Sequence, residues 1–178
     1  MNTIQFTRLD ATNVSPHSLD TFIRHQVVQE SWRFLDGAWV TIPNPFTEDW
    51  DLTQRRQVAG NLSEKLQGAW FAYGAFACDQ LVGYLAVSKE AFGSARQYFE
   101  LTLFHVSEPY RRQGIGRQLF ALAAAEAKRL GAKKLYISAH SSVESQAAYR
   151  SLGCTFAKEI NQTLAQQEPC DIQMEYVL

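Results

Sequence analysis

Cysteine and net charge are both scarce in this chain of 178 residues. The three cysteines, Cys78, Cys154 and Cys170, form no CxxC pair and are odd in number, so neither a disulfide framework nor a thiolate zinc site is expected. No spacing of histidines or carboxylates is typical of a metal site either. The formal net charge of −1 provides no basic field for nucleic acid. We therefore expect a reducing, cytoplasmic environment, no metal and no nucleic-acid partner.

Long hydrophobic runs and targeting signals are also missing. No apolar run approaches the ~18 residues that a membrane helix needs. The first ten residues, MNTIQFTRLD, lack the charged and then apolar pattern of a secretory signal. Repeats, low-complexity tracts and linker compositions are absent as well. The chain is therefore expected to form one domain over residues 1–178 that is neither exported nor embedded in a membrane.

The first third of the chain mixes periodic segments with one that has no clear period. Apolar and polar residues alternate over 3–9, which predicts a strand. A serine followed by a proline marks a helix start, so residues 15–23 are expected to be helical. Two prolines in IPNPF argue against a long regular element within 26–51. Residues 51–67, DLTQRRQVAGNLSEKLQ, have the apolar spacing of an amphipathic helix.

From residue 69 the pattern changes to that of a sheet with intervening helices. A β-hairpin, a nearly apolar central strand and a helix closed by Gly131 come first, and short strands and one more helix follow. The expected strands cover 69–77, 81–88, 96–106, 133–139, 154–160 and 170–178, and the expected helices cover 113–130 and 142–152. Strand, helix and strand over 97–139 leave room for a parallel crossover. The predicted fold class is mixed α/β, with a central β-sheet flanked by helices.

The stretch EPYRRQGIGRQLF, residues 108–120, places arginines and glycines where the central strand turns into a helix. Two established phosphate loops do not fit it. A Walker loop requires GxxxxGK[ST], which occurs nowhere in the chain. A dinucleotide fingerprint requires a third glycine where Leu119 stands. A phosphate site in this stretch must therefore belong to another class.

A helix N-terminus remains as the candidate anion site. The free N–H groups of the first helical turn point out of the helix end, and Gly114 and Gly116 lack the Cβ that would keep a pyrophosphate away. Arg111, Arg112 and Arg117 add charge at the rim. The alternative is that the glycines only ease packing of the helix on the sheet while the arginines face solvent. The coincidence of glycines, arginines and a preceding apolar strand favours the anion site.

The same stretch carries a family resemblance. Val106, SEP, YRRQGIGRQL and, downstream, AYRSLGC resemble the GCN5-related N-acetyltransferase (GNAT) family, whose signature R/Q-x-x-G-x-G/A corresponds here to residues 111–116. The resemblance is specific over about residues 97–157, and the order of elements extends it to nearly the whole chain. It implies a GNAT-like acyl-CoA N-acyltransferase fold with acetyl-CoA as co-substrate. It also implies a bulge that splays the strand ending at Val106 from 133–139, with the pantetheine arm in the gap.

By this resemblance, residues of the loop and of the strand end would hold the coenzyme. The implied contacts are His105, Val106, Arg111, Arg112, Gln113, Gly114, Ile115, Gly116, Arg117 and Ser142. Ser142 stands where the family often has an asparagine. The backbone N–H of Val106, or of a neighbour at the bulge, would stabilise the oxyanion. Cys154 has no base partner in the motif, and we interpret it as a small buried side chain rather than an acyl carrier.

Two side chains are candidates for proton transfer. Tyr149 stands where the family places its general-acid tyrosine, which protonates the departing thiolate; the alternative is a tyrosine that only packs its ring. Glu100 interrupts an apolar strand at the position of the family's strand glutamate, and burial would raise its pKa as a general base. The alternatives are a Glu100 that faces water or pairs with Arg96, and a water relay as base. Two histidines rank behind Glu100 as bases: His105 and His140.

The acceptor wall is expected in the variable segment, about residues 26–67. Its aromatic residues include three candidates for substrate binding: Trp32, Trp39 and Trp50. Three nearby acids could hold a cationic amine: Glu48, Asp49 and Asp51. In the alternative interpretation the aromatic side chains cap the core and the acids face water.

Two functions of different class remain open. The first is an acetyl-CoA-dependent N-acetyltransferase that acetylates a primary amine of a small molecule or peptide in a ternary complex, with Tyr149 as acid and Glu100 as base. The second is a non-catalytic module that binds an acyl-CoA as a sensor or regulatory subunit. Both require the loop 111–116, whereas Tyr149 and Glu100 favour the first. A homodimer is one assembly that the family implies.

Overall fold

A seven-stranded mixed sheet and a separate two-stranded hairpin organise the computed structural model, which describes residues 3–178. The large sheet has the strand order β1-β4-β5-β6-β7-β9-β8, and the hairpin pairs β2 with β3. In chain order the elements are β1 (Ile4–Leu9), β2 (His25–Leu35), β3 (Ala38–Asp49), α1 (Leu52–Lys65), β4 (Trp70–Ala77), β5 (Gln80–Phe92), β6 (Tyr98–Val106), a 3₁₀ turn (Glu108–Tyr110), α2 (Ile115–Arg129), β7 (Lys134–Ala139), α3 (Val143–Ser151), β8 (Thr155–Phe156), α4 (Gln162–Gln167) and β9 (Ile172–Val177). Neighbouring strands of the large sheet are antiparallel except β6 and β7, which are parallel.

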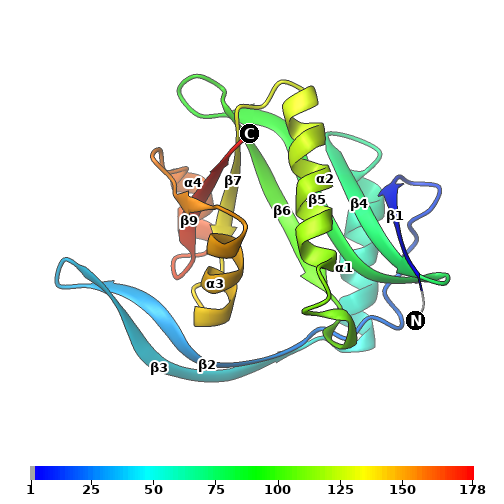
Figure 1. Ribbon diagram of the computed structural model, residues 1–178, viewed down its shortest axis with the longest axis horizontal. Coiled ribbons are helices and arrows are strands. Elements are labelled where there is room, and N and C mark those ends of the chain that lie inside the picture. The colour runs from blue at the N-terminus through cyan, green and yellow to red at the C-terminus, as the bar shows by residue number, and fades with distance from the viewer. Residues whose placement is uncertain (1–2) are drawn as a thin grey trace.

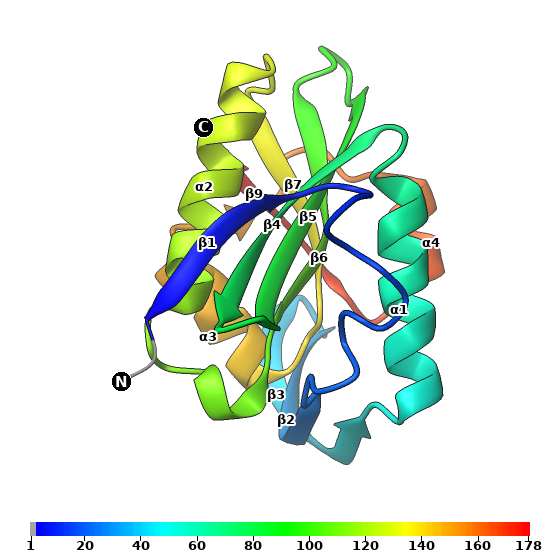
Figure 2. The ribbon, with the colours of Figure 1, turned by 90° about the vertical axis from the view of Figure 1, so that its right-hand side faces the viewer.

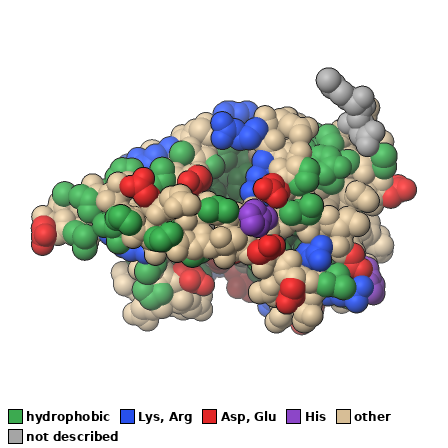
Figure 3. All heavy atoms as spheres, turned by 90° about the horizontal axis from the view of Figure 1, so that it is seen from below, with side chains coloured by type: hydrophobic (Ala, Val, Ile, Leu, Met, Phe, Trp, Pro, Cys, Tyr) green, Lys and Arg blue, Asp and Glu red, His purple; other side chains and the backbone are tan. Residues whose placement is uncertain are grey.

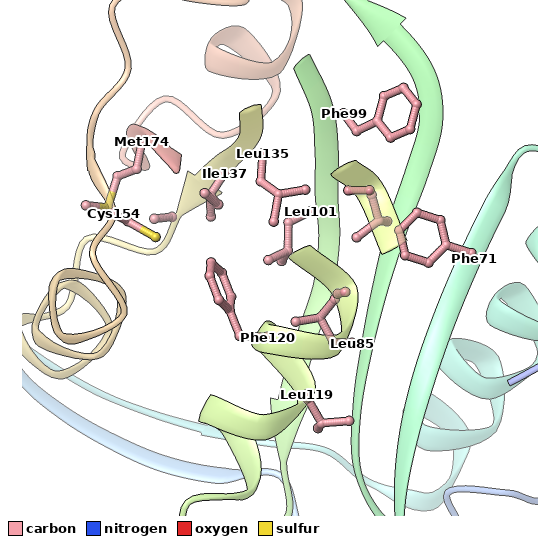
Figure 4. Close-up of a cluster of buried hydrophobic side chains, with 14 of the residues drawn as sticks. Phe71, Leu85, Phe99, Leu101, Leu119, Phe120, Leu135, Ile137, Cys154 and Met174 are labelled. Carbon is pink, nitrogen blue, oxygen red and sulfur yellow. The ribbon is translucent and has the colours of Figure 1, made fainter. Parts of the chain in front are cut away.

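Helices cover both faces of the large sheet. Figures 1 and 2 show α2 and α3 on one face, here called the α2 face, and α1 and α4 on the other, the α1 face. On the α2 face, Phe120 of the helix packs with Leu101 and Ile137 of the strands in the core shown in Figure 4. On the α1 face, Leu62 of α1 packs in a second core with Tyr84 of β5. Apolar burial on both faces is what an α/β sheet requires, and the predicted fold class is confirmed.

The hairpin of β2 and β3 is a long arm that leaves the large sheet and passes below α3 (Figure 1). It is anchored midway, where the Trp32 N–H donates to the Ser141 carbonyl at 2.8 Å and Ser31 forms a β-bridge with Ser142. None of the helices in the described part of the chain combines the length and the hydropathy needed to cross a bilayer.

Most of the expected elements are confirmed. The strand over 3–9, the helix over 51–67 and the hairpin over 69–88 correspond to β1, α1 and the β4–β5 pair. The parallel crossover is confirmed as β6, α2 and β7. Asp51 caps α1 by accepting the backbone N–H of Gln54, as a residue at that position commonly does. The sequence patterns therefore locate the central sheet and its main helices.

The expected helix over 15–23 is wrong. These residues form successive turns, in which the Phe22 N–H donates to the Leu19 carbonyl, three residues back rather than the four of an α-helix. Arg55 of α1 donates to the carbonyl oxygens of Asp20 and Phe22 at 2.6 and 3.1 Å. A side chain from a distant helix therefore satisfies the backbone here, which no local pattern could predict.

The expectation of no long regular element within 26–51 is also wrong, because this segment forms the β2–β3 hairpin. Asp36 and Gly37 join the strands with φ values of +50° and +82°, the conformation of a two-residue type I′ turn for which Asp-Gly is a strong signal. Pro43 and Pro45 lie where the strand register shifts, and within residues 3–178 the only partner strand of β3 is β2. Proline is tolerated at bulges and edge strands, so these two do not break the hairpin.

The C-terminal region differs from expectation in its boundaries. The strand expected over 154–160 shrinks to β8, and the unexpected helix α4 follows it. Asn161 caps α4 by accepting the backbone N–H groups of Thr163 and Leu164. No residue of α4 is buried, so the helix lacks the apolar stripe that would have revealed it in the sequence.

Candidate active site

Strands β6 and β7 form a fork in the middle of the sheet. Their parallel ladder has three register pairs and ends with Glu100 opposite Tyr136. Beyond this pair both strands continue without pairing with each other. In β6 a bulge at Thr102 accompanies a register shift against β5. The splaying implied by the family resemblance is confirmed, and the bulge lies at Thr102 within the strand that ends at Val106.

The arginine-rich loop leads from β6 into the N-terminus of α2. Gly114 is the N-cap of α2 with φ of +82°, and a Cβ built there would meet no atom within 4 Å. The Gln118 N–H donates back to the Gly114 carbonyl, so the amides of the first turn lack intrahelical partners and face outward. An anion can approach this helix end closely and interact with these amides and the helix dipole.

Gly116 has a different role from Gly114. A Cβ at Gly116 would lie 3.3 Å from Cζ of Phe104 and 3.8 Å from Cγ2 of Val106. This glycine lets α2 lie close to β6, as the packing alternative supposed. The two glycines of the motif therefore divide the roles, with Gly116 packed against the sheet and Gly114 open.

The three arginines of the loop also differ in what they contact. Arg111 donates from Nε to the Val106 carbonyl at 2.9 Å and from Nη1 to the His25 carbonyl at 2.7 Å. These bonds tie the end of β6 to the start of β2. Arg112 and Arg117 are exposed at the helix end. The charge available to a ligand at the rim therefore comes from Arg112 and Arg117, while Arg111 holds the loop in place.

Three other expected coenzyme contacts have side chains engaged within the chain. Gln113 donates from Nε2 to the Pro109 carbonyl at 3.0 Å, and Ile115 is buried in the core. Ser142 is fully buried and caps α3 by accepting the backbone N–H of Ser145 at 3.2 Å. Gln113 and Ile115 can offer a ligand their backbone groups, whereas the structure gives the Ser142 hydroxyl a capping role instead.

Glu100 lies at the base of the fork and faces the α1 face of the sheet, because its neighbours Phe99 and Leu101 pack in the core on the α2 face. The side chain is half-buried and has neither a hydrogen bond nor an ion pair within the described part of the chain. Arg96, the alternative partner, does not pair with it. Burial, and then the charge of Glu90, raise the pKa of Glu100 above its usual value.

Tyr149 reaches the fork from the opposite face of the sheet. Its ring lies 6.1 Å from that of Phe104 in β6, and the side chain packs against the core on the α2 face. Burial, and then the nearby Cys154 and Asp171, raise the pKa of Tyr149, so the phenol is protonated at neutral pH. The Tyr149 hydroxyl makes no hydrogen bond to any described residue. Burial also raises the pKa of the Cys154 thiol to about 12, which fits a buried side chain better than a nucleophile.

His105 lies beside the fork but does not face the arginine-rich loop. Its ring contacts those of Trp50 and Tyr84, with centroids 5.0 and 5.5 Å away, on the α1 face. Burial, and then the charges of Arg24 and Arg111, lower the pKa of His105 to about 3. The imidazole is therefore neutral at pH 7 and a weaker base than Glu100. The His105 backbone pairs with Tyr84 and, two residues before Ser107, is directed to β5 rather than to the fork.

The backbone of Val106 faces the fork. The Ser107 N–H donates to the Val82 carbonyl of β5 at 2.8 Å. Because successive N–H groups of a strand point to alternate sides, the Val106 N–H points away from β5 and toward the gap. The Val106 carbonyl on the same side accepts from Arg111. A backbone donor is therefore directed at the place where the two strands separate.

The three expected tryptophans lie apart along the β2–β3 hairpin. Trp39 stacks on Phe156 near the hairpin tip, with ring centroids 5.3 Å apart. Trp50 contacts His105 at the hairpin base, and Trp32 lies between the two. These side chains do not form one aromatic wall, so they cannot all contact one small acceptor.

Each of the three expected acids already has a partner in the chain. Glu48 forms an ion pair with Arg24, whose guanidinium also lies over Trp50. Asp49 approaches Nδ1 of His25 at 3.4 Å, and Asp51 caps α1. The structure therefore does not support these acids as the ones that hold a cationic amine.

Sequence reasoning missed a cavity on the α1 face. It has a volume of about 340 Å³ and lies between α1 and the sheet. Four apolar residues and one amide line it, and two charged residues stand at its rim: Val58, Leu62, Trp70, Leu103, Asn61, Glu64 and Lys65. In the sequence Trp70 and Leu103 resemble core residues, and only the strand register brings them together.

The chain is similar in sequence pattern and in fold to known acetyltransferases. The chain matches the family described as "Acetyltransferase (GNAT) family" over residues 25–154. A comparison with curated proteins finds no match. The similar solved structures include nourseothricin acetyltransferase, with a TM-score of 0.71, 16% identity and 98% of each chain covered. They also include a proposed streptothricin acetyltransferase from Bacillus anthracis str. Ames in complex with acetyl coenzyme A (TM-score 0.68, 15% identity, 99% of this chain and 98% of that chain).

A third similar structure is the PaiA N-acetyltransferase from Thermoplasma acidophilum in complex with coenzyme A (TM-score 0.63, 17% identity, 99% of each chain). At these identities the likeness establishes the fold. The family match covers most of the chain, including the fork, the arginine-rich loop and α3. The chain therefore belongs to the GNAT family of acetyltransferases.

Proposed function

We propose that the protein transfers the acetyl group of acetyl-CoA directly to a primary amine within a ternary complex. The observation that carries this proposal is the fork, which has an unpaired carboxylate, Glu100, on one face and an unbonded phenol, Tyr149, on the other. A thioester lying in the fork can be approached by an amine from the α1 face while its thiol is protonated from the α2 face. Family membership supports acetyl transfer, and two similar proteins were solved with acetyl coenzyme A or coenzyme A.

The co-substrate fits the N-terminus of α2. Outward amides and the open position at Gly114 suit a pyrophosphate, and Arg112 and Arg117 supply positive charge at the rim. On the face seen from below, Figure 3 shows a hollow with Lys and Arg side chains next to it. The unpaired lengths of β6 and β7 provide backbone groups for an extended arm that runs into the fork.

Glu100 acts as the general base. An amine enters as an ammonium ion, and its nitrogen becomes a nucleophile only after one proton leaves. The Glu100 carboxylate is unpaired and its pKa is raised, so it accepts that proton more readily than an exposed glutamate would. Its position at the end of the β6–β7 ladder sets it beside the place where the thioester would lie.

Tyr149 acts as the general acid. The neutral amine forms a C–N bond to the acetyl carbon, the C–S bond breaks, and the thiolate takes the phenolic proton of Tyr149. The nitrogen releases its surplus proton as the amide forms, and the phenolate regains a proton from solvent. The raised pKa keeps Tyr149 protonated across the pH range in which the base is ionised. The Val106 N–H, directed into the fork, supports the developing oxyanion.

A thiol-release assay tests this function. The purified protein is incubated with acetyl-CoA and a panel of primary amines, polyamines, aminoglycosides and peptides, and free thiol is followed over time. We expect release that depends on the presence of an amine. Tight binding of acetyl-CoA with no release for any amine would instead favour the acyl-CoA sensor.

A further inference from the structure

The cavity between α1 and the sheet lies on the same face of the sheet as Glu100. In the register of β5 and β6, Glu100 pairs with Ser88 and Leu103 pairs with Ala86. Ser88 and Ala86 are two residues apart in β5 and so point to the same face. Because the bulge at Thr102 takes up the extra residue of β6, Leu103 lies on the α1 face together with Glu100. The cavity wall formed by Leu103 is therefore on the same face and the same strand as the proposed base.

The register between β4 and β5 shows where Trp70, on the other side of the cavity from Leu103, lies relative to Glu100. Trp70 of β4 pairs with Ser88 of β5, which in turn pairs with Glu100 of β6. Two strand spacings separate the backbones of Trp70 and Glu100, which is roughly 10 Å. Only the small side chain of Ser88 stands between them on this face. The indole of Trp70 and the carboxylate of Glu100 thus border the same stretch of the sheet surface.

The lining of the cavity is mostly apolar, with one amide, Asn61, and balanced charge at the rim. Val58 and Leu62 of α1 face Trp70 and Leu103 across it. The two charged rim residues, Glu64 and Lys65, are adjacent in sequence and opposite in sign. A volume of about 340 Å³ is at the lower end of the range for small-molecule sites and can hold one aryl or branched alkyl group.

We propose that this cavity seats the apolar group of the acceptor, and that the acceptor is a primary amine carrying one aryl or branched alkyl group with its nitrogen at Glu100. This inference rests on the proposed acetyl transfer and names its substrate class. A polycationic acceptor would need several unpaired carboxylates. Glu90 stands near Glu100, but at the cavity Glu64 is offset by Lys65, and the acids at the hairpin base are engaged.

The apolar lining also favours the reactive form of the amine. Partial desolvation destabilises an ammonium ion relative to the neutral amine, so a proton passes more readily from the acceptor to the carboxylate of Glu100. The transfer moves one proton from nitrogen to carboxylate oxygen and requires no further reactant. Binding and deprotonation are therefore coupled at the same site.

The test compares acceptors and blocks the cavity. Values of kcat/KM are measured for 2-phenylethylamine, isoamylamine, spermidine and kanamycin with saturating acetyl-CoA. Leu103→Phe replaces a branched alkyl side chain of the cavity with a larger phenyl ring. Leu130→Phe makes the same change at an exposed position at the end of α2 and serves as the control. Calorimetry with a thiol-lacking analogue of coenzyme A measures amine binding without turnover.

We expect the two apolar amines to exceed spermidine and kanamycin by at least about tenfold in kcat/KM. Leu103→Phe should raise KM for 2-phenylethylamine by at least about tenfold and leave KM for acetyl-CoA unchanged. Leu130→Phe should change neither. A preference for the polycations, or an unchanged KM in Leu103→Phe, would overturn the cavity assignment while leaving acetyl transfer intact. If calorimetry shows that 2-phenylethylamine binds and that Leu103→Phe weakens this binding, but no thiol is released, the cavity assignment stands and the proposed acetyl transfer is overturned. If 2-phenylethylamine neither binds nor causes thiol release, the cavity assignment is overturned.

Discussion

Glu100 of β6 stands opposite Tyr136 of β7, and this is the pair at which the parallel ladder between the two strands ends. Burial, and to a smaller degree the charge of Glu100, raise the pKa of Tyr136, so the two groups interact electrostatically. Tyr136 is held in place by a hydrogen bond from its hydroxyl to Gln173 at 2.8 Å. The pair places an unpaired carboxylate at the vertex of the fork, on the face from which an acceptor can approach.

Replacing the proposed base should remove proton transfer and keep the fold. Glu100→Gln conserves the shape of the side chain, so kcat should fall by about 10²- to 10⁴-fold while KM for acetyl-CoA changes little. Steady-state kinetics checks this, with Glu30→Gln as the matched control because Glu30 is an exposed glutamate of the β2–β3 hairpin. A loss of kcat in Glu100→Gln no larger than that in Glu30→Gln would leave the water relay as the base.

The same carboxylate predicts the pH dependence. A base is active only when deprotonated, so kcat/KM should fall as the pH decreases through the pKa of Glu100. Burial, and then Glu90, raise that pKa, so the acid limb should lie above the ordinary glutamate value of 4.5. The limb should be absent in Glu100→Gln, and its persistence there at the same pH would assign it to another group.

Tyr149→Phe tests the general acid. The variant keeps the ring that packs near Phe104 and loses only the hydroxyl, which has no partner among the described residues. Turnover should fall on the order of 10²-fold with little loss of coenzyme affinity. Tyr73→Phe, on a strand away from the fork, is the control. Equal turnover in wild type and Tyr149→Phe would remove Tyr149 as the acid.

The open cap of α2 makes a prediction about coenzyme binding. Gly114→Glu places bulk and negative charge at the helix end and should abolish binding of coenzyme A in calorimetry. Gly114→Ala is the control for backbone strain. The alanine must adopt the same φ of +82° as the glutamate, but it adds no charge, and its Cβ has no neighbouring atom within 4 Å. It should cost about 1 kcal/mol of stability and bind far better than the Glu variant. Unchanged affinity in Gly114→Glu would contradict a phosphate site at this helix end.

Ser142 should affect stability and leave coenzyme affinity unchanged. Its buried hydroxyl accepts the Ser145 N–H and caps α3, so Ser142→Ala should lower the free energy of unfolding by about 1 kcal/mol. Thermal unfolding and calorimetry with coenzyme A measure the two effects side by side. A variant that keeps its Tm and loses affinity for coenzyme A would restore the contact that the family resemblance implied.

The central sheet and the arginine-rich loop at the start of α2 were predictable because their signals are local. Three of these signals are each carried by residues that are close together in the sequence: the alternation in β1, the apolar run of β6 and the Arg111–Gly116 motif. Glu100 could be singled out as a candidate because it is the one carboxylate in a nearly apolar strand, 98–106. These features required no knowledge of the rest of the chain.

The hairpin and the acceptor side were not predictable for the opposite reason. Asp36-Gly37 did signal a turn, but the prolines of β3 obscured it, and the carbonyl groups before β2 are bonded by Arg55 from another element. The cavity on the same face as Glu100 combines Trp70 and Leu103, whose proximity depends on two strand registers and a bulge. Pairing across strands, rather than residue type, decides what lies next to Glu100.

Direct acetyl transfer can be examined by mass spectrometry of both the amine and the protein after reaction of acetyl-CoA with 2-phenylethylamine. We predict that N-acetylated amine accumulates in an amount equal to the free thiol, that the protein itself stays unmodified, and that Glu100→Gln forms far less product. Coenzyme binding with no acetylated amine from any member of the amine panel, or an acetyl group retained on Cys154, would contradict direct transfer at the fork.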